Sequence, residues 1–185
     1  MAICHPNSEE LRTVQDSIDA GRPCVQALIA YNHFLLSHKE PGNDFVRIYN
    51  STVGPLSDHI KLQLSLIYGR EARDVRVRFP PVHRQPVGSN LCGPLVCAFM
   101  ADILEGRSPE NSLYCKEAQQ RRWPVNMIET EQFTACPKKG AERRPTDALT
   151  TAMHEQIVTP ADATALRVSL CTGSTRRISN ILHKV

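Results

Sequence analysis

The sequence is poor in aromatic residues and has no hydrophobic run long enough to cross a membrane. Phe, Trp and Tyr make up only 5% of its 185 residues, so the core must rest on Leu, Ile and Val. The opening segment, Met1-Ala-Ile-Cys-His-Pro6, lacks the charged start and the apolar stretch of a secretion signal. We therefore expect one sizeable domain, located inside the cell in the nucleus or cytoplasm, with no membrane as a partner.

The seven cysteines lack the even number and regular spacing of a disulfide-bonded secreted domain. Reduced thiols fit this pattern better, and zinc binding is the alternative use. Structural zinc sites favour two closely spaced ligand pairs, which the spacing does not supply. We therefore predict neither a metal nor a cofactor, and we expect Cys97 to pack within a helix. The possible zinc ligands are Cys92, Cys97, Cys115, Cys136 and His83.

The net charge of +3 is modest, and basic residues gather toward the C-terminus. Residues 138–185 hold eight Lys or Arg against four Asp or Glu. Such a segment can contact nucleic acid, but the sequence has no recognised nucleic-acid-binding motif and no concentrated basic helix. We interpret residues 138–185 as a partly disordered basic tail and expect no nucleic-acid partner.

Hydrophobic periodicity predicts an α+β domain over residues 20–137. An N-terminal extension, residues 1–19, carries the signal for a short amphipathic helix. A second helix is predicted over 56–67, where apolar residues share one face. Four strands are predicted, at residues 24–29, 33–36, 45–49 and 75–79.

The later part of the chain gives weaker helical signals. The apolar run Cys92–Leu104 predicts a helix packed inside the domain, which Gly106 ends. Pro124 is expected to kink or divide any helix over 116–128. Residues 146–158 are compatible with one more helix, within the predicted tail.

The most informative segment is Gln85-Pro-Val-Gly-Ser-Asn-Leu-Cys92-Gly-Pro-Leu-Val-Cys-Ala-Phe99. A cysteine stands there at the point where a polar, glycine-containing loop becomes an apolar helix. The unpaired N–H groups and the dipole of a helix start both favour a thiolate. A buried cysteine that only fills space is the alternative. Upstream, His33 and Asn50 lie in two predicted strand segments and supply the other two parts of a cysteine-nucleophile site.

Four short motifs follow one another along the chain: His33-Phe34, Tyr49-Asn50-Ser51, Gln85, and Asn90-Leu-Cys92-Gly93. Their order resembles that of the ubiquitin-like-protein-specific cysteine proteases, the SUMO (sentrin) proteases and their transposon-borne relatives. That family has His-Trp, Tyr-Asp-Ser, Gln and Asp-Cys-Gly. The resemblance covers roughly residues 24–137 and implies a papain-like fold, in which a mixed sheet packs on a central helix that starts at the catalytic cysteine.

The resemblance implies a role for four residues. His33 would act as general base and acid for Cys92, and Asn50 would orient the imidazole, as Asn does in papain-like enzymes. Gln85 would stabilise the oxyanion together with the backbone N–H of Cys92. A purely structural role is the alternative for three of them. His33 could be a hydrogen-bonded strand histidine, Asn50 could end a strand in a turn, and Gln85 could be a solvated loop residue.

The resemblance also implies a substrate channel formed by Phe34, Gly88 and Gly93. In the family a Trp ring lines the channel for the Gly-Gly tail, and Phe34 stands in its place. Asn50 replaces the family's Asp, and the chain before His33 is shorter than usual. The resulting hypothesis is a thiol-dependent isopeptidase that cleaves after the Gly-Gly end of a ubiquitin-like modifier through an acyl-enzyme. The alternative is a degenerate domain that binds a modifier or another protein without cleaving it.

Overall fold

The computed structural model describes residues 9–70, 73–139, 148–150 and 155–159. These residues form one five-stranded sheet in the order β1-β2-β3-β4-β5, in which β3 and β4 are parallel and the other neighbours antiparallel. The protein is therefore an α+β domain with a mixed sheet. Its elements are α1 (Glu9–Asp19), β1 (Cys24–Ala30), β2 (His33–Lys39), β3 (Phe45–Tyr49), α2 (Asp58–Tyr68), β4 (Val75–Arg78), α3 (Cys92–Leu104), α4 (Glu117–Thr130) and β5 (Glu155–Val158).

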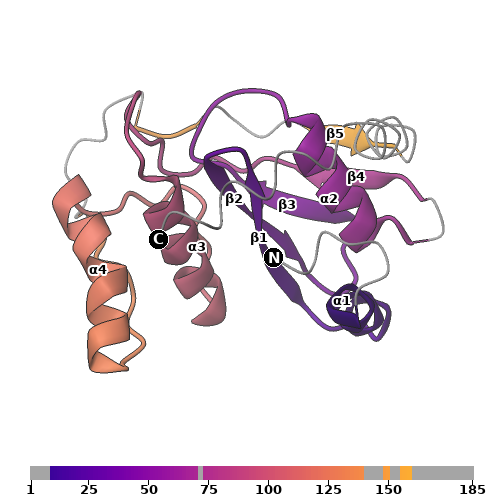
Figure 1. Cartoon of the computed structure of the whole chain (residues 1–185), viewed down its shortest axis with the longest axis horizontal. Helices are drawn as coiled ribbons and strands as arrows, with labels where there is room; N and C mark the ends of the chain where they lie inside the picture. The colour runs from indigo at the N-terminus through magenta and orange to yellow at the C-terminus, as the bar shows by residue number, and fades with distance from the viewer. Residues whose placement is uncertain (1–8, 71–72, 140–147, 151–154, 160–185) are drawn as a thin grey trace, which may run out of the picture.

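Helices cover both faces of the sheet. Figure 1 shows α1 and α2 on one side and α3 and α4 on the other. Successive side chains of a strand point to opposite faces, so Leu35 joins the core cluster under α1 and α2, while Leu36 joins the cluster under α3. The sheet therefore separates two hydrophobic cores. The strands that are buried on both faces are rich in Leu, Ile and Val.

The β1–β2 hairpin fixes the position of His33. Ala30 pairs with His33, so the turn consists of Tyr31 and Asn32 alone. Tyr31 has a φ of 54°, a left-handed conformation that is uncommon for a residue with a side chain. Two-residue hairpins require positive φ at their first or at both central positions, which explains this conformation. His33 thus begins β2 at one end of the sheet.

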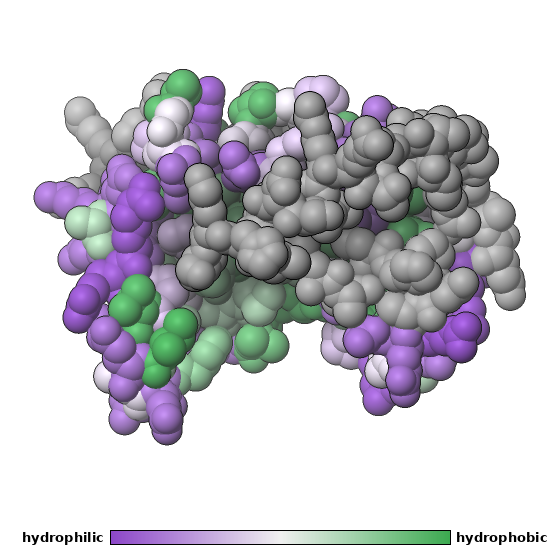
Figure 2. All heavy atoms as spheres, viewed as in Figure 1, coloured by the Kyte–Doolittle hydropathy of each residue, from purple (hydrophilic) through white to green (hydrophobic). Residues whose placement is uncertain are grey.

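Helix α3 buries one face rather than its whole surface. Leu95, Val96 and Phe99 pack against the sheet, while Leu104 is 65% exposed and Cys97 is exposed. The prediction that Cys97 packs inside the domain is therefore wrong, because its position on the helix falls on the side turned away from β2. Figure 2 shows further apolar surface over α4 and the end of α3.

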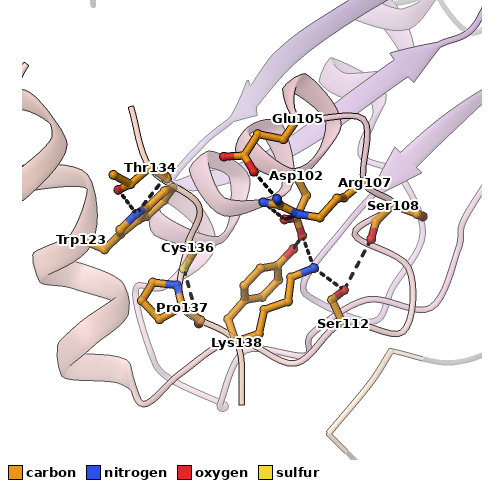
Figure 3. Close-up of polar contacts among 11 residues, drawn as sticks. Asp102, Glu105, Arg107, Ser108, Ser112, Trp123, Thr134, Cys136, Pro137 and Lys138 are labelled. Carbon is orange, nitrogen blue, oxygen red and sulfur yellow. Dashed lines mark hydrogen bonds and ion pairs between the residues drawn. The ribbon is translucent and has the colours of Figure 1, made fainter. Parts of the chain in front are cut away.

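A buried carboxylate holds the C-terminal half of α3. The Asp102 side chain is fully buried and accepts hydrogen bonds from the Tyr114 hydroxyl at 2.7 Å and from Arg107 Nε at 3.1 Å. The Lys138 ammonium lies 2.8 Å from the same carboxylate. Figure 3 shows these groups converging on Asp102 from the segments that follow α3. They neutralise a charge that would be costly to bury alone.

The sequence predicted that Pro124 would kink or divide a helix over 116–128, and α4 runs undivided from Glu117 to Thr130. Proline removes one helical donor, and other contacts hold this helix in place. Trp123 is 6% exposed, and its indole N–H donates to the Thr134 carbonyl at 3.2 Å, as Figure 3 shows. The burial of Trp123 therefore anchors the helix beside its proline.

Two segments that the sequence placed outside the domain belong to the packed structure. Leu11 of α1 is 1% exposed and lies in the core under α2. Strand β5 lies within the predicted tail and pairs with β4, with Val158 fully buried. The helix predicted over 146–158 is thus wrong at Glu155–Val158, because strand pairing and burial outweigh the weak helical pattern. The remainder of that segment, apart from 148–150, lies outside the described residues.

Candidate active site

The start of α3 lies against the turn that carries His33. Cys92 is the first residue of α3, and its side chain is 6% exposed. The Cys92 thiol donates to the carbonyl oxygen of Asn32 at 3.8 Å, and His33 follows Asn32 in the chain. Helix α3 packs directly on β2. The fold therefore brings Cys92 and His33, 59 positions apart in the sequence, to one end of the sheet.

Asn50 fixes the orientation of the His33 ring from the end of β3. The His33 Nε2 atom lies 2.8 Å from Asn50 Oδ1. The backbone N–H of Thr52 donates to the same oxygen at 3.1 Å, and the Thr52 hydroxyl donates to it at 3.0 Å. A backbone N–H can only donate, so this atom of Asn50 is an acceptor, and the proton shared with the ring belongs to His33 Nε2.

This assignment defines the tautomer of the ring. A neutral imidazole carries its proton on one nitrogen and accepts at the other. Because His33 Nε2 donates to Asn50, the Nδ1 atom is left as the proton acceptor. The ring nitrogen that can act as a base is therefore the one that does not face Asn50 and Thr52.

The first turn of α3 is open to a negative charge. Its N-cap, Leu91, makes no side-chain hydrogen bond to the turn, because a leucine side chain has no polar atom. Pro94 occupies the third helical position, where its missing N–H has no intrahelical partner. The N–H groups of Cys92 and Gly93 and the helix dipole therefore face the loop without a side-chain cap.

Gln85 is held in place by its side-chain amide and by its backbone. Its Oε1 atom accepts from the Ser51 hydroxyl at 2.9 Å, and its backbone N–H donates to the Ser51 carbonyl at 2.9 Å. Its Nε2 atom donates to the carbonyl of Ser89 at 3.0 Å, three positions before Cys92. An amide nitrogen has two protons, so Gln85 Nε2 carries a second one besides the proton donated to Ser89.

The three predicted substrate-channel residues do not lie equally close to one another. Phe34 is 38% exposed and lies beside Gly93, where an added Cβ would meet its ring at 4.0 Å, an ordinary contact. Gly88 belongs to the loop before α3 and has a φ of 76°, which favours glycine. Gly88 therefore serves the conformation of the loop, whereas Phe34 and Gly93 share one surface.

Two polar residues complete this network and were not singled out as site residues from the sequence. Ser51 links the end of β3 to Gln85, and Thr52 links it to both Asn50 and His33 Nε2, the latter at 3.2 Å. The signal was present in the run Asn50-Ser-Thr52, three consecutive hydrogen-bonding side chains at a strand end. Successive residues point in different directions there, which allows one segment to hold two different groups.

The alternative use of the cysteines as zinc ligands gains no support among the described residues, where no group of three His, Cys, Asp or Glu could hold a metal. His83 Nδ1 already accepts from the backbone N–H of Tyr114 at 2.9 Å. Cys115 and Cys136 hydrogen-bond to each other, and burial raises the pKa of the Cys136 thiol to about 12. These contacts already engage three of the five possible ligands.

Comparison with protein-family models finds no match, and comparisons with curated proteins and with solved structures find none. Within the described part of the chain, no helix is long and apolar enough to cross a membrane. Any assignment of function therefore rests on the geometry around Cys92 and His33.

Proposed function

We propose that the protein is a papain-like cysteine peptidase that cleaves after the Gly-Gly end of a ubiquitin-like modifier of the SUMO type. The observation that carries this proposal is the hydrogen-bonded chain from Thr52 through Asn50 to His33. It leaves an accepting ring nitrogen in a residue whose neighbour, Asn32, contacts the thiol of Cys92. A ring held in this tautomer presents Nδ1 as the atom that can accept the thiol proton.

The chemistry would proceed in two stages. His33 Nδ1 takes the proton of the Cys92 thiol, and the thiolate attacks the carbonyl carbon of the second glycine of the Gly-Gly pair. The oxyanion that forms accepts hydrogen bonds from the second Nε2 proton of Gln85 and from the backbone N–H of Cys92. The imidazolium then returns its proton to the leaving amine, which yields a thioester on Cys92.

The second stage hydrolyses the thioester. His33 Nδ1 accepts a proton from water, whose oxygen attacks the thioester carbonyl, and the Cys92 thiolate leaves and is reprotonated. Asn50 holds the ring through both stages but carries no charge, so it stabilises the imidazolium less than a carboxylate would. We therefore expect a slower enzyme than one with Asp at this position.

The preference for a Gly-Gly tail follows from the surface beside Cys92. The Phe34 ring lies against Gly93 at the start of α3, so a substrate residue that reaches Cys92 along this surface would have little room for a side chain. Glycine alone has none, which matches the end of a ubiquitin-like modifier. Phe34 presents a smaller ring than the Trp expected from the resemblance, and so defines a wider passage.

A second function is favoured by one specific contact. The Cys92 thiol donates to the Asn32 carbonyl, and a thiolate at that position would be repelled by the same oxygen. Together with the neutral Asn50, this contact suits a domain that binds a modifier and leaves the thiol protonated. Such a domain would show saturable binding that survives Cys92→Ala, with no cleavage product.

Covalent labelling distinguishes the two functions. The purified chain is incubated with a panel of ubiquitin-like modifiers that carry a C-terminal electrophile, and adducts are read by intact mass. The Cys92→Ala variant is the test, and Cys97→Ala is the matched control, because Cys97 is exposed on the same helix. We expect one adduct, lost in Cys92→Ala and retained in Cys97→Ala.

The opposite pattern is equally informative. Adducts that persist in Cys92→Ala and disappear in Cys97→Ala would report only an exposed thiol, and the peptidase would be abandoned. No adduct from any modifier, in a protein shown to be folded by circular dichroism, would favour the domain that binds without cleaving.

A further inference from the structure

A pocket with a volume of about 220 Å³ opens beside His33, between the β1–β2 turn and the segment that joins β3 to α2. Asp, Glu, Lys and Arg are absent from its described lining. An uncharged cavity of this kind suits an apolar group better than an ion. Its apolar lining includes Tyr31, Leu35, Val53, Pro55, Leu56 and Ile60.

The pocket adjoins the candidate active site on one particular side. Asn50 and Thr52, the two groups that contact His33 Nε2, both line it. The residues around Cys92, namely Phe34, Gln85 and Gly93, do not. The pocket therefore lies on the Nε2 side of the ring, and the thiol lies on the other side of the turn, against the Asn32 carbonyl.

Two apolar side chains that line the pocket are largely exposed to solvent. Tyr31 is 78% exposed and Val53 is 55% exposed. Tyr31 also adopts left-handed backbone angles, and its ring stands edge-on to His59 with centroids 5.1 Å apart. Apolar and aromatic side chains around a cavity are typical of sites that bind an apolar group.

We propose that this pocket is a specificity subsite that binds an apolar side chain of the substrate's leaving-group segment. The inference rests on the proposed function. In that reaction His33 Nδ1 returns a proton to the leaving amine, so the leaving segment begins at the Nδ1 edge of the ring, and its next residues can reach the pocket at the Nε2 edge. The Gly-Gly side of the substrate has no side chain to fill the pocket, whereas residues after the cleaved bond do.

The lining of the pocket indicates which side chains it would bind. Leu, Ile, Val, Met or Phe can displace water from its apolar walls, while a charged side chain would lose its hydration without finding a partner. The substrate class is therefore a modifier precursor, or a modified protein, with an apolar side chain close to the cleaved bond on the leaving side.

The test is a peptide library in which a fixed Gly-Gly pair is followed by three randomised positions. The full chain is incubated with the library, and products are counted by mass spectrometry. We expect one position after the cut to favour Leu, Ile, Val, Met or Phe over Ala by roughly tenfold, the discrimination that a few methylene groups give in an apolar pocket.

Two variants that each replace an exposed apolar residue with Glu test whether the pocket causes the side-chain preference. Val53→Glu places a carboxylate at the rim of the pocket and should shift the preferred residue to Lys or Arg. Ile128→Glu makes the same change on α4, where Ile128 is 79% exposed and outside the pocket, and should leave the profile unchanged.

The outcomes separate the subsite from the peptidase. Cleavage after Gly-Gly with no apolar preference beyond the cut would overturn the subsite and leave the proposed function standing. An apolar preference that survives Val53→Glu would also overturn it. If the wild-type chain cleaves no peptide and forms no Cys92-dependent adduct, both proposals fall.

If cleavage is too slow to measure, binding of a small apolar ligand tests the subsite. Acetyl-leucine amide titrated into the chain should shift the methyl NMR signals of Val53, Leu56 and Ile60, and Val53→Glu should weaken that shift at least severalfold. Unchanged signals at millimolar acetyl-leucine amide would refute the subsite independently of catalysis.

Discussion

At the scale of single residues, the hydroxyl of Thr52 is the least expected part of the site. It donates to Asn50 Oδ1 at 3.0 Å and lies 3.2 Å from His33 Nε2. The backbone N–H of Thr52 makes a separate hydrogen bond to the same Asn50 oxygen. The side chain and the backbone of one residue therefore both constrain the amide that orients the ring.

Thr52→Val removes the hydroxyl and keeps the shape of the side chain. One hydrogen bond contributes about 1 kcal/mol, so we expect kcat to fall roughly fivefold with KM unchanged, because the ring orients less well while the substrate surface is intact. Thr52→Ser keeps the hydroxyl and should restore kcat. A KM increase with unaltered kcat would instead place Thr52 in substrate binding.

Asn50→Asp tests whether the neutral partner limits the rate. A carboxylate accepts the same hydrogen bonds from Thr52 and adds a negative charge beside the imidazolium that forms during the reaction. We expect kcat/KM to rise by roughly fivefold or more, measured on the substrate that the labelling panel identifies. No change in rate would mean that proton transfer to His33 does not limit the reaction.

The sequence predicted which residues would form this site from their chemistry and order, but not how their side chains are held. Cys92, His33, Asn50 and Gln85 were chosen for their chemistry and order, and the fold places them around one end of the sheet. Ser51 and Thr52 were missed because hydroxyl residues at a strand end are common in ordinary turns. Only the distances to Gln85 and to Asn50 distinguish them from such turns.

At the scale of secondary-structure elements, the buried carboxylate of Asp102 ties α3 to the segments that follow it. Asp102→Asn removes the charge that Tyr114, Arg107 and Lys138 surround. Hydrogen bonds to charged groups contribute about 1.5–3 kcal/mol, so we expect the free energy of unfolding to fall by about 2–3 kcal/mol in urea titrations. Tyr114→Phe should cost about 1 kcal/mol, because the other partners remain. Equal losses in both variants would contradict this ranking.

The segment between β4 and α3 should make stability depend on pH. His83 accepts a hydrogen bond from the Tyr114 N–H, and burial together with the charge of Lys139 lowers the pKa of His83 from 6.5 to about 4. The unfolded chain therefore binds a proton on this residue between those two values, and the folded chain does not. Stability from this residue is complete above pH 6.5 and is lost as the pH falls toward 4.

Urea titrations at two pH values measure this effect. Between pH 7 and pH 5 we expect His83 to account for a loss of about 2 kcal/mol of unfolding free energy. Burial also lowers the pKa of His38, which acts in the same direction, so the matched comparison is His83→Asn. That variant keeps an acceptor for Tyr114 but cannot titrate, and its loss on acidification should be smaller by the same amount. An identical loss in both proteins would exclude His83.

Elements with strong periodic patterns were predicted well, and the exceptions have physical reasons. The strands at Cys24–Ala30, His33–Lys39 and Phe45–Tyr49 alternate or run apolar as buried strands do. Helix α4 was expected to be kinked or divided at Pro124, and it is not divided. Trp123 is buried beside the proline, a contact that no local sequence rule registers. Strand β5 is only four residues long, too short for its alternation to outweigh a weak helical pattern.

At the scale of the whole molecule, the site depends on how the two layers of helices meet the sheet. His33 and Asn50 belong to strands, whereas Cys92 belongs to α3. The ring centroids of Tyr49 in β3 and Phe99 in α3 lie 6.1 Å apart. The core cluster under α3 therefore fixes the position of this helix on the sheet. Changes on the opposite face of the sheet should therefore affect stability before they affect the reactivity of Cys92.

Strand β5 offers a direct test of that separation, because it belongs to the sheet although it lies far along the chain. Val158 is fully buried in the cluster under α2, and its neighbour Ile157 is 57% exposed. Val158→Ala removes two buried carbon atoms and should lower the free energy of unfolding by about 2 kcal/mol. Ile157→Ala should change it by less than about 0.5 kcal/mol.

Both variants should keep the Cys92-dependent adduct under conditions where they are folded, since Val158 belongs to the core cluster under α1 and α2, and α3 packs in the other cluster. Equal stability losses in the two variants would show that β5 does not bury Val158 in solution, and the segment beyond residue 137 would then be the independent tail that its composition predicts. A loss confined to Val158→Ala makes this segment part of the domain, and any chain shortened for the labelling experiment must then retain it.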